Sequence, residues 1–355
     1  MKKIITVLGA RPQFIKAATV SRAIADKKEH LREIIIHTGQ HFDKEMSEIF
    51  FQEMDIPAPH YRLNINGLGH GAMTGQMMEK IEEILISEKP DFVLVYGDTN
   101  STLAGALAAS KLHINVVHVE AGLRSFNMKM PEEINRILTD RISNFLFCPT
   151  ETAIKNLKNE GFDNFSAKIH NVGDVMYDAV NYYQTKTSPN PLFDFEYVLC
   201  TVHRAENTDD SERLTSIVTA LNEINTEIPV IMPLHPRTRN LLINLGIKIE
   251  FKTIDPVGYF DMLNLLKYST IVMTDSGGLQ KEAYLFNKYC ITLRDETEWV
   301  ELVDSKVNFL VGAEIDTIMK TYHSVKKMKN TSFESNLYGD ATAAQKIVNI
   351  LLDSI

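Results

Sequence analysis

The chain alternates between short apolar runs and stretches with helical spacing. In its first part the apolar runs fall at residues 4–8, 33–37, 92–96, 116–119 and 145–147, each of the length of a buried strand. Apolar residues recur at helical spacing after most of these runs, for example over residues 13–26 and 132–143. Because strands that alternate with helices form right-handed βαβ units, this pattern predicts a parallel sheet covered by helices.

The alternation weakens between residues 161 and 191 and then begins again. The second series predicts strands at residues 198–202, 229–232, 271–273 and 290–293. A chain of 355 residues is also longer than one ordinary core. We therefore expect an α/β fold with two Rossmann-like domains, at residues 1–172 and 173–340, and a ligand cleft between them. On this pattern alone, the last predicted helix, at residues 341–355, could belong to either domain.

Three carboxylates of the first series fall where a ligand site is expected. Asp98 and Glu120 come just after two of the predicted strands, and Glu132 lies at a predicted helix start. In an open α/β sheet the ligand crevice lies outside the carboxyl ends of the strands. Since Arg124 and Arg136 are close in sequence, the placement predicts acid/base chemistry beside an anion site. Taken singly, each carboxylate could instead be a structural cap.

Two glycine turns join a predicted strand to a predicted helix, which is where backbone N–H groups bind phosphates. The candidate ligand-binding residues of these turns are Arg11, Lys16, Ser276, Gly277, Gly278 and Glu282. Ser276 is expected to cap its helix, and Glu282 to accept hydrogen bonds from a ribose. Either turn could be an ordinary strand–helix connection, and the first lacks the GxGxxG spacing of a dinucleotide site.

Two histidines follow predicted strands of the second series. His203 stands beside Arg204 and could act as a general acid or donate a hydrogen bond to a leaving phosphate. His235 lies between Pro233 and Pro236 with two arginines just beyond, which fits a loop that faces an anion. Both segments could equally be ordinary polar loops.

Net charge, apolar segment length and residue spacing argue against several kinds of partner and site. The formal net charge of −9 argues against a nucleic-acid partner or an anionic membrane surface. No apolar segment approaches the roughly 20 residues that span a bilayer. The eleven histidines and three cysteines show no metal-binding spacing. We therefore expect a cytoplasmic protein with reduced, buried thiols and no metal.

The ordered motifs of this chain resemble those of the non-hydrolysing UDP-N-acetylglucosamine 2-epimerase family over nearly the whole length. They are GARPQFIK (9–16), TGQH (38–41), YGDTNST (96–102), HVEAGLRS (118–125), PEEINR (131–136), HRAEN (203–207), LHPRTR (234–239) and TDSGGLQKEA (274–283). The resemblance implies the two-domain glycosyltransferase-B fold with UDP in the interdomain cleft. It also implies that the C-terminal helix packs on the first domain and that the protein is a homodimer.

The resemblance further implies a two-step reaction on a UDP-sugar substrate. UDP is eliminated across C1–C2 to leave a bound glycal, and is then added back with C2 inverted, so that no NAD or other cofactor is required. The motif match gives Asp98, Glu120, Glu132 and His203 as catalytic candidates, without saying which carboxylate is the base. It gives as substrate-binding candidates Arg11, Lys16, Arg136, His235, Ser276, Gly277, Gly278 and Glu282.

Two positions depart from the commonest pattern of the family. Gln13-Phe14 stands where a glutamate and a small residue are usual, and Trp299-Val300 where an Arg-Pro pair is usual. These variants look closest to the subgroup that acts on UDP-2,3-diacetamido-2,3-dideoxy-glucuronate, whose sugar carries a carboxylate. A glutamate near that sugar would add a repulsion of about 1 kcal/mol or more. We therefore hypothesise that Gln13 helps to admit the uronate.

Two alternatives to a uronate epimerase of bacterial surface polysaccharide synthesis stay open at this point. The first keeps the reaction and changes the sugar to UDP-N-acetylglucosamine. The second is a glycosyltransferase, because fold alone does not fix function. The three carboxylates argue against a transferase, which needs at most one base and an acceptor groove.

Overall fold

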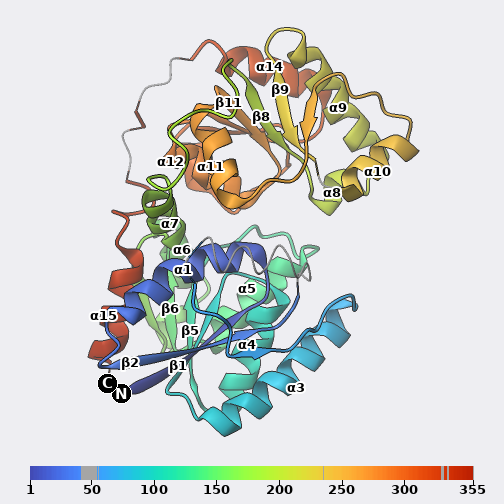
Figure 1. Ribbon diagram of the computed structural model, residues 1–355. Coiled ribbons are helices and arrows are strands. Elements are labelled where there is room, and N and C mark those ends of the chain that lie inside the picture. Colours follow the sequence, from blue (N-terminus) through green and yellow to red (C-terminus); the bar gives the residue numbers. More distant parts are fainter. Residues whose placement is uncertain (41–53, 55, 235, 329–331, 334–335, 355) are drawn as a thin grey trace. The chain divides into compact units, whose positions relative to one another are not determined.

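The computed structural model describes residues 1–40, 54, 56–234, 236–328, 332–333 and 336–354. The chain divides into two units (Figure 1): unit 1 comprises Met1–Ala179 and Asn336–Ile355, and unit 2 comprises Val180–Ser335. Each unit is a parallel sheet with helices packed on it, which confirms the predicted α/β fold class. Helical spacing in the sequence also predicts a helix over residues 42–54, which falls outside the described residues except at its last position.

Unit 1 contains a seven-stranded parallel sheet in the order β3-β2-β1-β4-β5-β6-β7. The strands are β1 (Lys2–Leu8), β2 (Leu31–His37), β3 (Tyr61–Arg62), β4 (Phe92–Tyr96), β5 (Asn115–Val119), β6 (Phe145–Cys148) and β7 (Lys168–Asn171). Its helices are α1 (Arg11–Ala25), α3 (His70–Glu88), α4 (Asn100–Lys111), α5 (Pro131–Ile142), α6 (Glu151–Asn159), η1 (Phe162–Asn164) and α15 (Ala343–Asp353). The chain passes from unit 1 to unit 2 within α7 (Val175–Tyr183).

The central strands of unit 1 are rich in apolar residues because helices cover both faces of the sheet. All five residues of β4 are buried, for example. Helix α4 is rich in small residues, and a Cβ added to its Gly105 would lie 3.1 Å from Val7 and 3.2 Å from Val95. The small side chains therefore let α4 pack closely on β1 and β4. At the end of the chain, α15 packs against α1.

Unit 2 contains a six-stranded parallel sheet in the order β10-β9-β8-β11-β12-β13. The strands are β8 (Val198–Thr201), β9 (Val230–Pro233), β10 (Lys252–Ile254), β11 (Ile271–Thr274), β12 (Cys290–Thr292) and β13 (Asn308–Leu310). Its helices are α8 (Ala205–Thr208), α9 (Ser211–Asn225), α10 (Pro236–Asn244), α11 (Tyr259–Tyr268), α12 (Gly277–Leu285), α13 (Val300–Asp304) and α14 (Ile315–Val325).

Three short strands of the structure, β3, β10 and β13, were not predicted from the sequence pattern. Each lies at an edge of its sheet. An edge strand pairs on one side only and is partly exposed, so its sequence does not form a continuous apolar run. β10, for example, reads KTI and has no fully buried residue.

Strand order reverses once in each sheet, between β1 and β4 in unit 1 and between β8 and β11 in unit 2. Such a switch point leaves a crevice at the carboxyl ends of the two strands, because their connections leave in opposite directions. In unit 1 these ends lead to Gly9 and to Gly97. In unit 2 they lead to His203 and to Asp275. The sequence candidates for ligand binding therefore concentrate at the two switch points.

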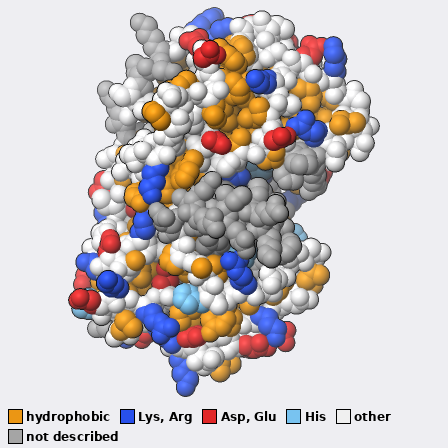
Figure 2. Space-filling view, viewed as in Figure 1, with side chains coloured by type: hydrophobic (Ala, Val, Ile, Leu, Met, Phe, Trp, Pro, Cys, Tyr) orange, Lys and Arg blue, Asp and Glu red, His pale blue; other side chains and the backbone are white. Residues whose placement is uncertain are grey.

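The surface carries charges of both signs. On the face shown in Figure 2, the basic and acidic side chains of the described residues are interspersed over each unit. None of the helices in the described ranges is both long and apolar enough to cross a membrane. The three cysteines, Cys148, Cys200 and Cys290, are free and buried, as predicted.

Candidate active site

The side chain of Gln13 joins the two turns at the switch point of unit 1. Its Oε1 accepts hydrogen bonds from the backbone N–H groups of Gly9 (2.8 Å) and Ala10 (3.0 Å). Its Nε2 donates to the carbonyl oxygen of Tyr96 (2.8 Å) and to the hydroxyl of Thr102 (2.9 Å). Because backbone groups fix which end of the amide donates, the side chain has one orientation. Gln13 thus ties the β1–α1 turn to the β4–α4 turn.

Glu120 lies at the end of β5 with its backbone in the left-handed region, at φ 73°. This conformation is uncommon for a residue other than glycine and often marks a functional constraint. The carboxylate forms an ion pair with the ammonium group of Lys16 from α1, and both side chains are largely buried. A Cβ on Gly97 would lie 3.2 Å from Glu120 Oε2 and 3.3 Å from Lys16 Nζ. The pair therefore sits against the turn that carries Asp98.

The guanidinium group of Arg136 bridges two carboxylates. It donates from NH2 to Asp98 Oδ2 (2.6 Å) and from NH1 to Glu133 Oε2 (2.7 Å). Glu133 also accepts from the backbone N–H groups of Ser125 and Phe126, both at 2.9 Å. Burial alone raises the pKa of Glu133, but these hydrogen bonds and Arg136 hold it below its ordinary value. Glu133 is therefore a fixed anion that orients Arg136 toward Asp98.

Helix α5, which supplies Arg136, buries polar residues and exposes apolar ones, the reverse of the usual arrangement. Its buried side consists of polar and charged residues, namely Glu133, Asn135, Arg136, Thr139 and Asp140. Its apolar residues Ile134 and Leu138 are exposed instead. Glu132 is half-buried in the first turn, four residues before Arg136 and hence near it on the helix surface. A helix that buries charge serves a site rather than an apolar core.

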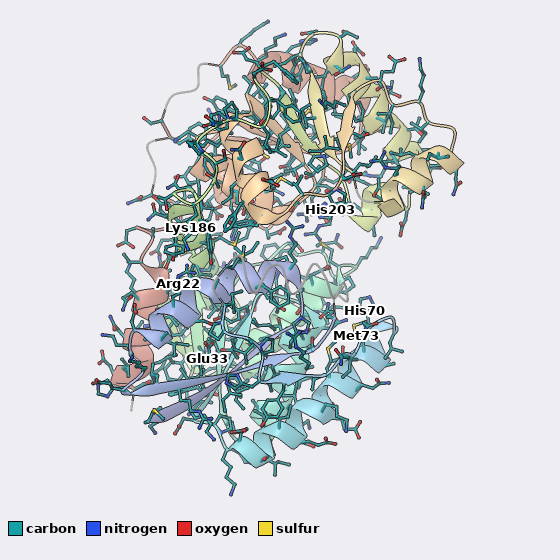
Figure 3. All side chains as sticks on the ribbon, viewed as in Figure 1. Arg22, Glu33, His70, Met73, Lys186 and His203 are labelled. Carbon is teal, nitrogen blue, oxygen red and sulfur yellow. The ribbon has the colours of Figure 1, made fainter. Side chains whose placement is uncertain are left out.

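A second chain of polar contacts leads away from Asp98. Asn135 donates to the carbonyl oxygen of Asp98 (2.8 Å) and to the side chain of Asn100 (3.3 Å). Asn100 in turn contacts His70 Nδ1 (3.1 Å) and Met73 Sδ (3.8 Å), which lie side by side at the start of α3 (Figure 3). The backbone of the Asp98 turn is thus held from α5 as well as from α1.

In unit 2 a buried carboxylate shapes the loop of His203. Asp275 accepts hydrogen bonds from the backbone N–H groups of His203 (3.0 Å) and Arg204 (2.9 Å) and from Asn207 Nδ2 (3.2 Å). The Nδ1 atom of His203 lies 3.5 Å from Asp275 Oδ1, while its side chain remains half exposed beside α8 (Figure 3). Asp275 therefore holds the backbone and Nδ1 side of His203, while the rest of the imidazole is accessible to solvent.

The Ser276-Gly277-Gly278 turn opens α12 at the same switch point. Ser276 occupies the N-cap position, but the predicted capping bond is wrong, because its side chain makes no such hydrogen bond in the described residues. Its backbone N–H instead donates to Thr274 Oγ1 (2.9 Å). A Cβ on Gly277 would lie 2.3 Å from Glu298 Oε1, so a larger residue would displace that carboxylate. Gly278 is exposed at the helix start, where backbone N–H groups favour an anion.

Trp299, which stands where the family usually has an arginine, lies next to this turn. Lys281 Nζ lies 4.0 Å from the centre of the indole ring, at the distance of a cation–π contact. Next to it, the fully buried Arg294 donates to Glu298 Oε2 (3.0 Å). Glu282 is also buried in α12. The structure thus gathers cations and carboxylates around the start of α12.

The predicted site residues fall into two groups. In unit 1 the structure brings Lys16, Asp98, Glu120 and Arg136 together around Gly97, with Arg11 and Glu132 in the first turns of α1 and α5. In unit 2 it brings His203 and the Ser276-Gly277-Gly278 turn to one switch point, with Glu282 in α12. His235 lies outside the described residues. Across the described ranges, no cluster of three or more His, Cys, Asp or Glu residues could hold a metal ion.

Several polar residues of the site were not among the sequence candidates, although Glu133 belongs to the acidic pair Glu132-Glu133 at the predicted helix start. Glu133, Asp140 and Asp275 are buried and organise the turns of the candidate residues. For Asp275 the signal was its place at a strand end, next to the recognised glycine turn. Nothing in the local pattern distinguished Asp140 from a surface residue of α5.

This arrangement can transfer protons and bind anions. Carboxylates held by cations at the carboxyl ends of parallel strands can act as general acids and bases on a bound ligand. Helix starts and cations nearby can stabilise the negative charge of a leaving group.

Comparison with known proteins agrees with these features. Residues 23–352 match the family model described as UDP-N-acetylglucosamine 2-epimerase. Over 352 residues the chain is 58% identical to the UDP-2,3-diacetamido-2,3-dideoxy-D-glucuronate 2-epimerase of Pseudomonas aeruginosa, which covers 98% of this chain and 99% of that protein.

Solved structures agree as well. The UDP-GlcNAc 2-epimerase of Methanocaldococcus jannaschii, in complex with UDP-GlcNAc and UDP, superposes with a TM-score of 0.88 at 42% identity over 98% of this chain and 99% of that chain. The enzyme of Neisseria meningitidis bound to UDP-GlcNAc gives a TM-score of 0.89 at 31% identity over 99% and 100% of the two chains.

Proposed function

Because the chain belongs to the UDP-N-acetylglucosamine 2-epimerase family, we propose that it inverts C2 of a UDP-2-acetamido sugar by eliminating and re-adding UDP. The observation that carries this reaction is the pair of carboxylates Asp98 and Glu120, each held by a cation at the switch point of unit 1. The family is one of isomerases, so the glycosyltransferase alternative is set aside.

In the first step a carboxylate removes the C2 proton while the C1–O bond breaks and UDP leaves with the bonding electrons. The product is a glycal, with a double bond between C1 and C2. In the second step UDP returns to C1 and C2 receives a proton on the opposite face. Two proton-transfer groups on two faces of one sugar are therefore needed, and Asp98, Glu120 and Glu132 form the candidate set.

The leaving diphosphate requires positive groups that act as its charge develops. In unit 1 we assign this role to Arg11, Lys16 and Arg136. In unit 2 we assign UDP binding to the Ser276-Gly277-Gly278 turn and Glu282, since glycines and a helix start allow the backbone to approach phosphate oxygens. His203, accessible at its tip, is assigned to protonate or hydrogen-bond the leaving phosphate. His235 stays a candidate from its motif.

The proposed substrate is UDP-2,3-diacetamido-2,3-dideoxy-glucuronate, and the product is the corresponding manno-uronate. This choice rests on the greater identity to the Pseudomonas aeruginosa uronate epimerase. The second candidate is UDP-N-acetylglucosamine, which is bound in the solved relatives from Methanocaldococcus jannaschii and Neisseria meningitidis. We further propose that the protein is cytoplasmic, serves bacterial surface polysaccharide synthesis and needs no added cofactor.

The test is to incubate the protein with each UDP-sugar in D2O and to follow C2 by proton NMR. We expect deuterium at C2 of both epimers, with a higher kcat/KM for the uronate than for UDP-N-acetylglucosamine. Absence of exchange with either sugar would reject the epimerase. Exchange with UDP-N-acetylglucosamine alone would reject the uronate as substrate.

The family resemblance also implies a homodimer, which we include in the proposal. Light scattering should then give twice the 40.2 kDa of one chain. A mass of 40.2 kDa at micromolar concentration would contradict this part of the proposal alone.

A further inference from the structure

We propose that His118 is a positioning residue that, together with Asp140, holds the turns of Asp98 and Glu120 in register. The inference rests on the proposed function, because it assigns a task to the turns that carry the acid/base residues. His118 belongs to β5, and Asp140 belongs to the polar side of α5. Neither side chain is among the candidates for substrate contact.

The imidazole of His118 is fully buried and bonded at both nitrogens. Its Nε2 lies 2.8 Å from the carbonyl oxygen of Gly97, and its Nδ1 lies 2.7 Å from Asp140 Oδ1. A carbonyl oxygen only accepts, so Nε2 carries a proton. An ionised carboxylate also only accepts, so Nδ1 carries one as well. The ring is therefore a donor on both sides, with one bond to the turn after β4 and the other to α5.

The other oxygen of Asp140 completes the bridge. Oδ2 accepts from the backbone N–H of Gly122 (3.1 Å) and from Arg124 NH1 (2.7 Å). Burial by itself raises the pKa of Asp140, but the hydrogen bond and charge of His118 and the charge of Arg124 lower it below its ordinary value. Asp140 is thus an anion that accepts three hydrogen bonds, from His118, Gly122 and Arg124.

The two ends of this bridge are the backbones next to the acid/base residues. Gly97 immediately precedes Asp98, and Gly122 comes two residues after Glu120. The second turn has little room to adjust, because a Cβ on Gly122 would lie 2.5 Å from the carbonyl oxygen of Ala153. His118 and Asp140 therefore set the distance between one turn and the other.

Stability alone does not explain such a cluster. Removing charged groups from water is costly, and apolar side chains of similar volume often serve a core equally well or better. Here His118 is hydrogen-bonded to the backbone of the Asp98 turn, and Asp140 to the backbone of the Glu120 turn. A displacement of about 1 Å in a reacting group can lower a rate by about 100-fold. The bridge therefore affects the reaction rate by fixing the positions of Asp98 and Glu120.

The test compares His118→Phe with a matched control, His170→Phe. Phenylalanine keeps a ring on β5 but removes both hydrogen bonds, and His170 lies in the same sheet on β7. We expect His118→Phe to lower kcat by about 10- to 100-fold with KM changed by less than about threefold. His170→Phe should leave both constants near those of the unmodified protein. A folded His118→Phe enzyme with unchanged kcat would overturn the proposal.

A second pair of variants decides the question even if His118→Phe does not fold. In Asp140→Asn the amide nitrogen can donate to Nδ1 while its oxygen still accepts from Gly122, so the bridge survives with one bond reversed. In Asp140→Ala the bridge is lost. We expect Asp140→Asn to retain about tenfold more kcat than Asp140→Ala. Equal kcat values for this pair would overturn the proposal.

Deuterium exchange at C2 separates this inference from the function on which it rests. If the unmodified protein exchanges no deuterium with either UDP-sugar, the proposed function fails. If it exchanges deuterium but the variants exchange at the same rate, only the positioning role of His118 fails.

Discussion

The side-chain nitrogen of Gln13 lies 2.8 Å from the backbone carbonyl oxygen of Tyr96. This bond crosses from the first turn of α1 to the end of β4, and the oxygen of the same amide is held by Gly9 and Ala10. Gln13 is therefore a link between two turns. The sequence hypothesis gave it a different role, the admission of a uronate, which stays a prediction.

We expect Gln13→Glu to lower kcat for both candidate sugars by a similar factor of about ten or more. A carboxylate at this position cannot donate a hydrogen bond to the Tyr96 carbonyl oxygen. The bond that joins the two turns is therefore lost, and two acceptors face each other. Steady-state kinetics with UDP-diacetamido-glucuronate and UDP-N-acetylglucosamine measure the effect, and the exposed Gln184→Glu is the control. A loss confined to the uronate would instead support the specificity role of Gln13.

Arg136→Lys should lower kcat by about tenfold or more while the protein stays folded. Lysine keeps the charge, but it cannot reproduce the planar guanidinium that reaches Asp98 and Glu133 from two nitrogens. Arg141→Lys is the matched control on α5, because Arg141 packs over the ring of Phe162. Equal activity of the two variants would show that charge alone suffices at Arg136.

Acid should destabilise the protein partly through His37. Burial, and then the charge of Arg62, lowers the pKa of His37 to about 4. The unfolded chain takes up this proton near pH 6.5, whereas the folded chain does not until about pH 4. The contribution to stability is therefore present above pH 6.5 and is lost as the pH falls toward 4.

His37→Phe should weaken this acid sensitivity. The new ring can keep the stacking on Phe14, whose centroid lies 5.2 Å from that of His37. Thermal unfolding between pH 4.5 and 7.5 measures the effect. We expect the Tm of the variant to fall less than that of the unmodified protein over this range. Parallel curves would exclude His37 as a source of the acid loss.

Asp178 should have the opposite effect from His37 and make the folded protein less stable as the pH rises. It accepts hydrogen bonds from the backbone N–H groups of Ala343 (3.1 Å) and Ala344 (2.7 Å) at the start of α15. Burial raises its pKa from 3.8 to about 6 despite these bonds. Between these two values the folded chain holds a proton that the unfolded chain has released, so stability falls as the pH rises.

Asp178→Asn removes this titration while it keeps one acceptor for the helix start. We expect the Tm deficit of the variant to be larger at pH 4.5 than at pH 7.5, because only the unmodified protein loses stability between them. The same unfolding series measures it. A deficit independent of pH would contradict the shifted pKa of Asp178.

The local sequence predicted those elements that a repeating pattern identifies. β4 and β5 were placed from their apolar runs, and α12 from the glycine turn before it. The edge strand β10 and helix α14 were not predicted. An edge strand lacks a continuous apolar run, and the start of α14 has no side-chain cap to signal it.

The candidate site was predicted less completely than the fold. The motifs gave Asp98 and Glu120, because residues at strand ends converge in any parallel sheet, and Arg136 from the helix start that follows. They did not give the partners of these residues. The ion pair of Lys16 with Glu120 joins positions 104 residues apart, and the bond of His118 to Gly97 depends on the pairing of β4 with β5.

The sequence by itself determined the two parallel-sheet units, the family and the set of polar residues at the strand ends. It could do so because burial periodicity and turn chemistry act over a few neighbouring residues. The tertiary structure decided which charges meet, which glycines face a carboxylate and why α5 buries its polar side. Those choices depend on strand order and on packing between distant segments, so only the folded chain makes Gln13 a link and His118 a bridge.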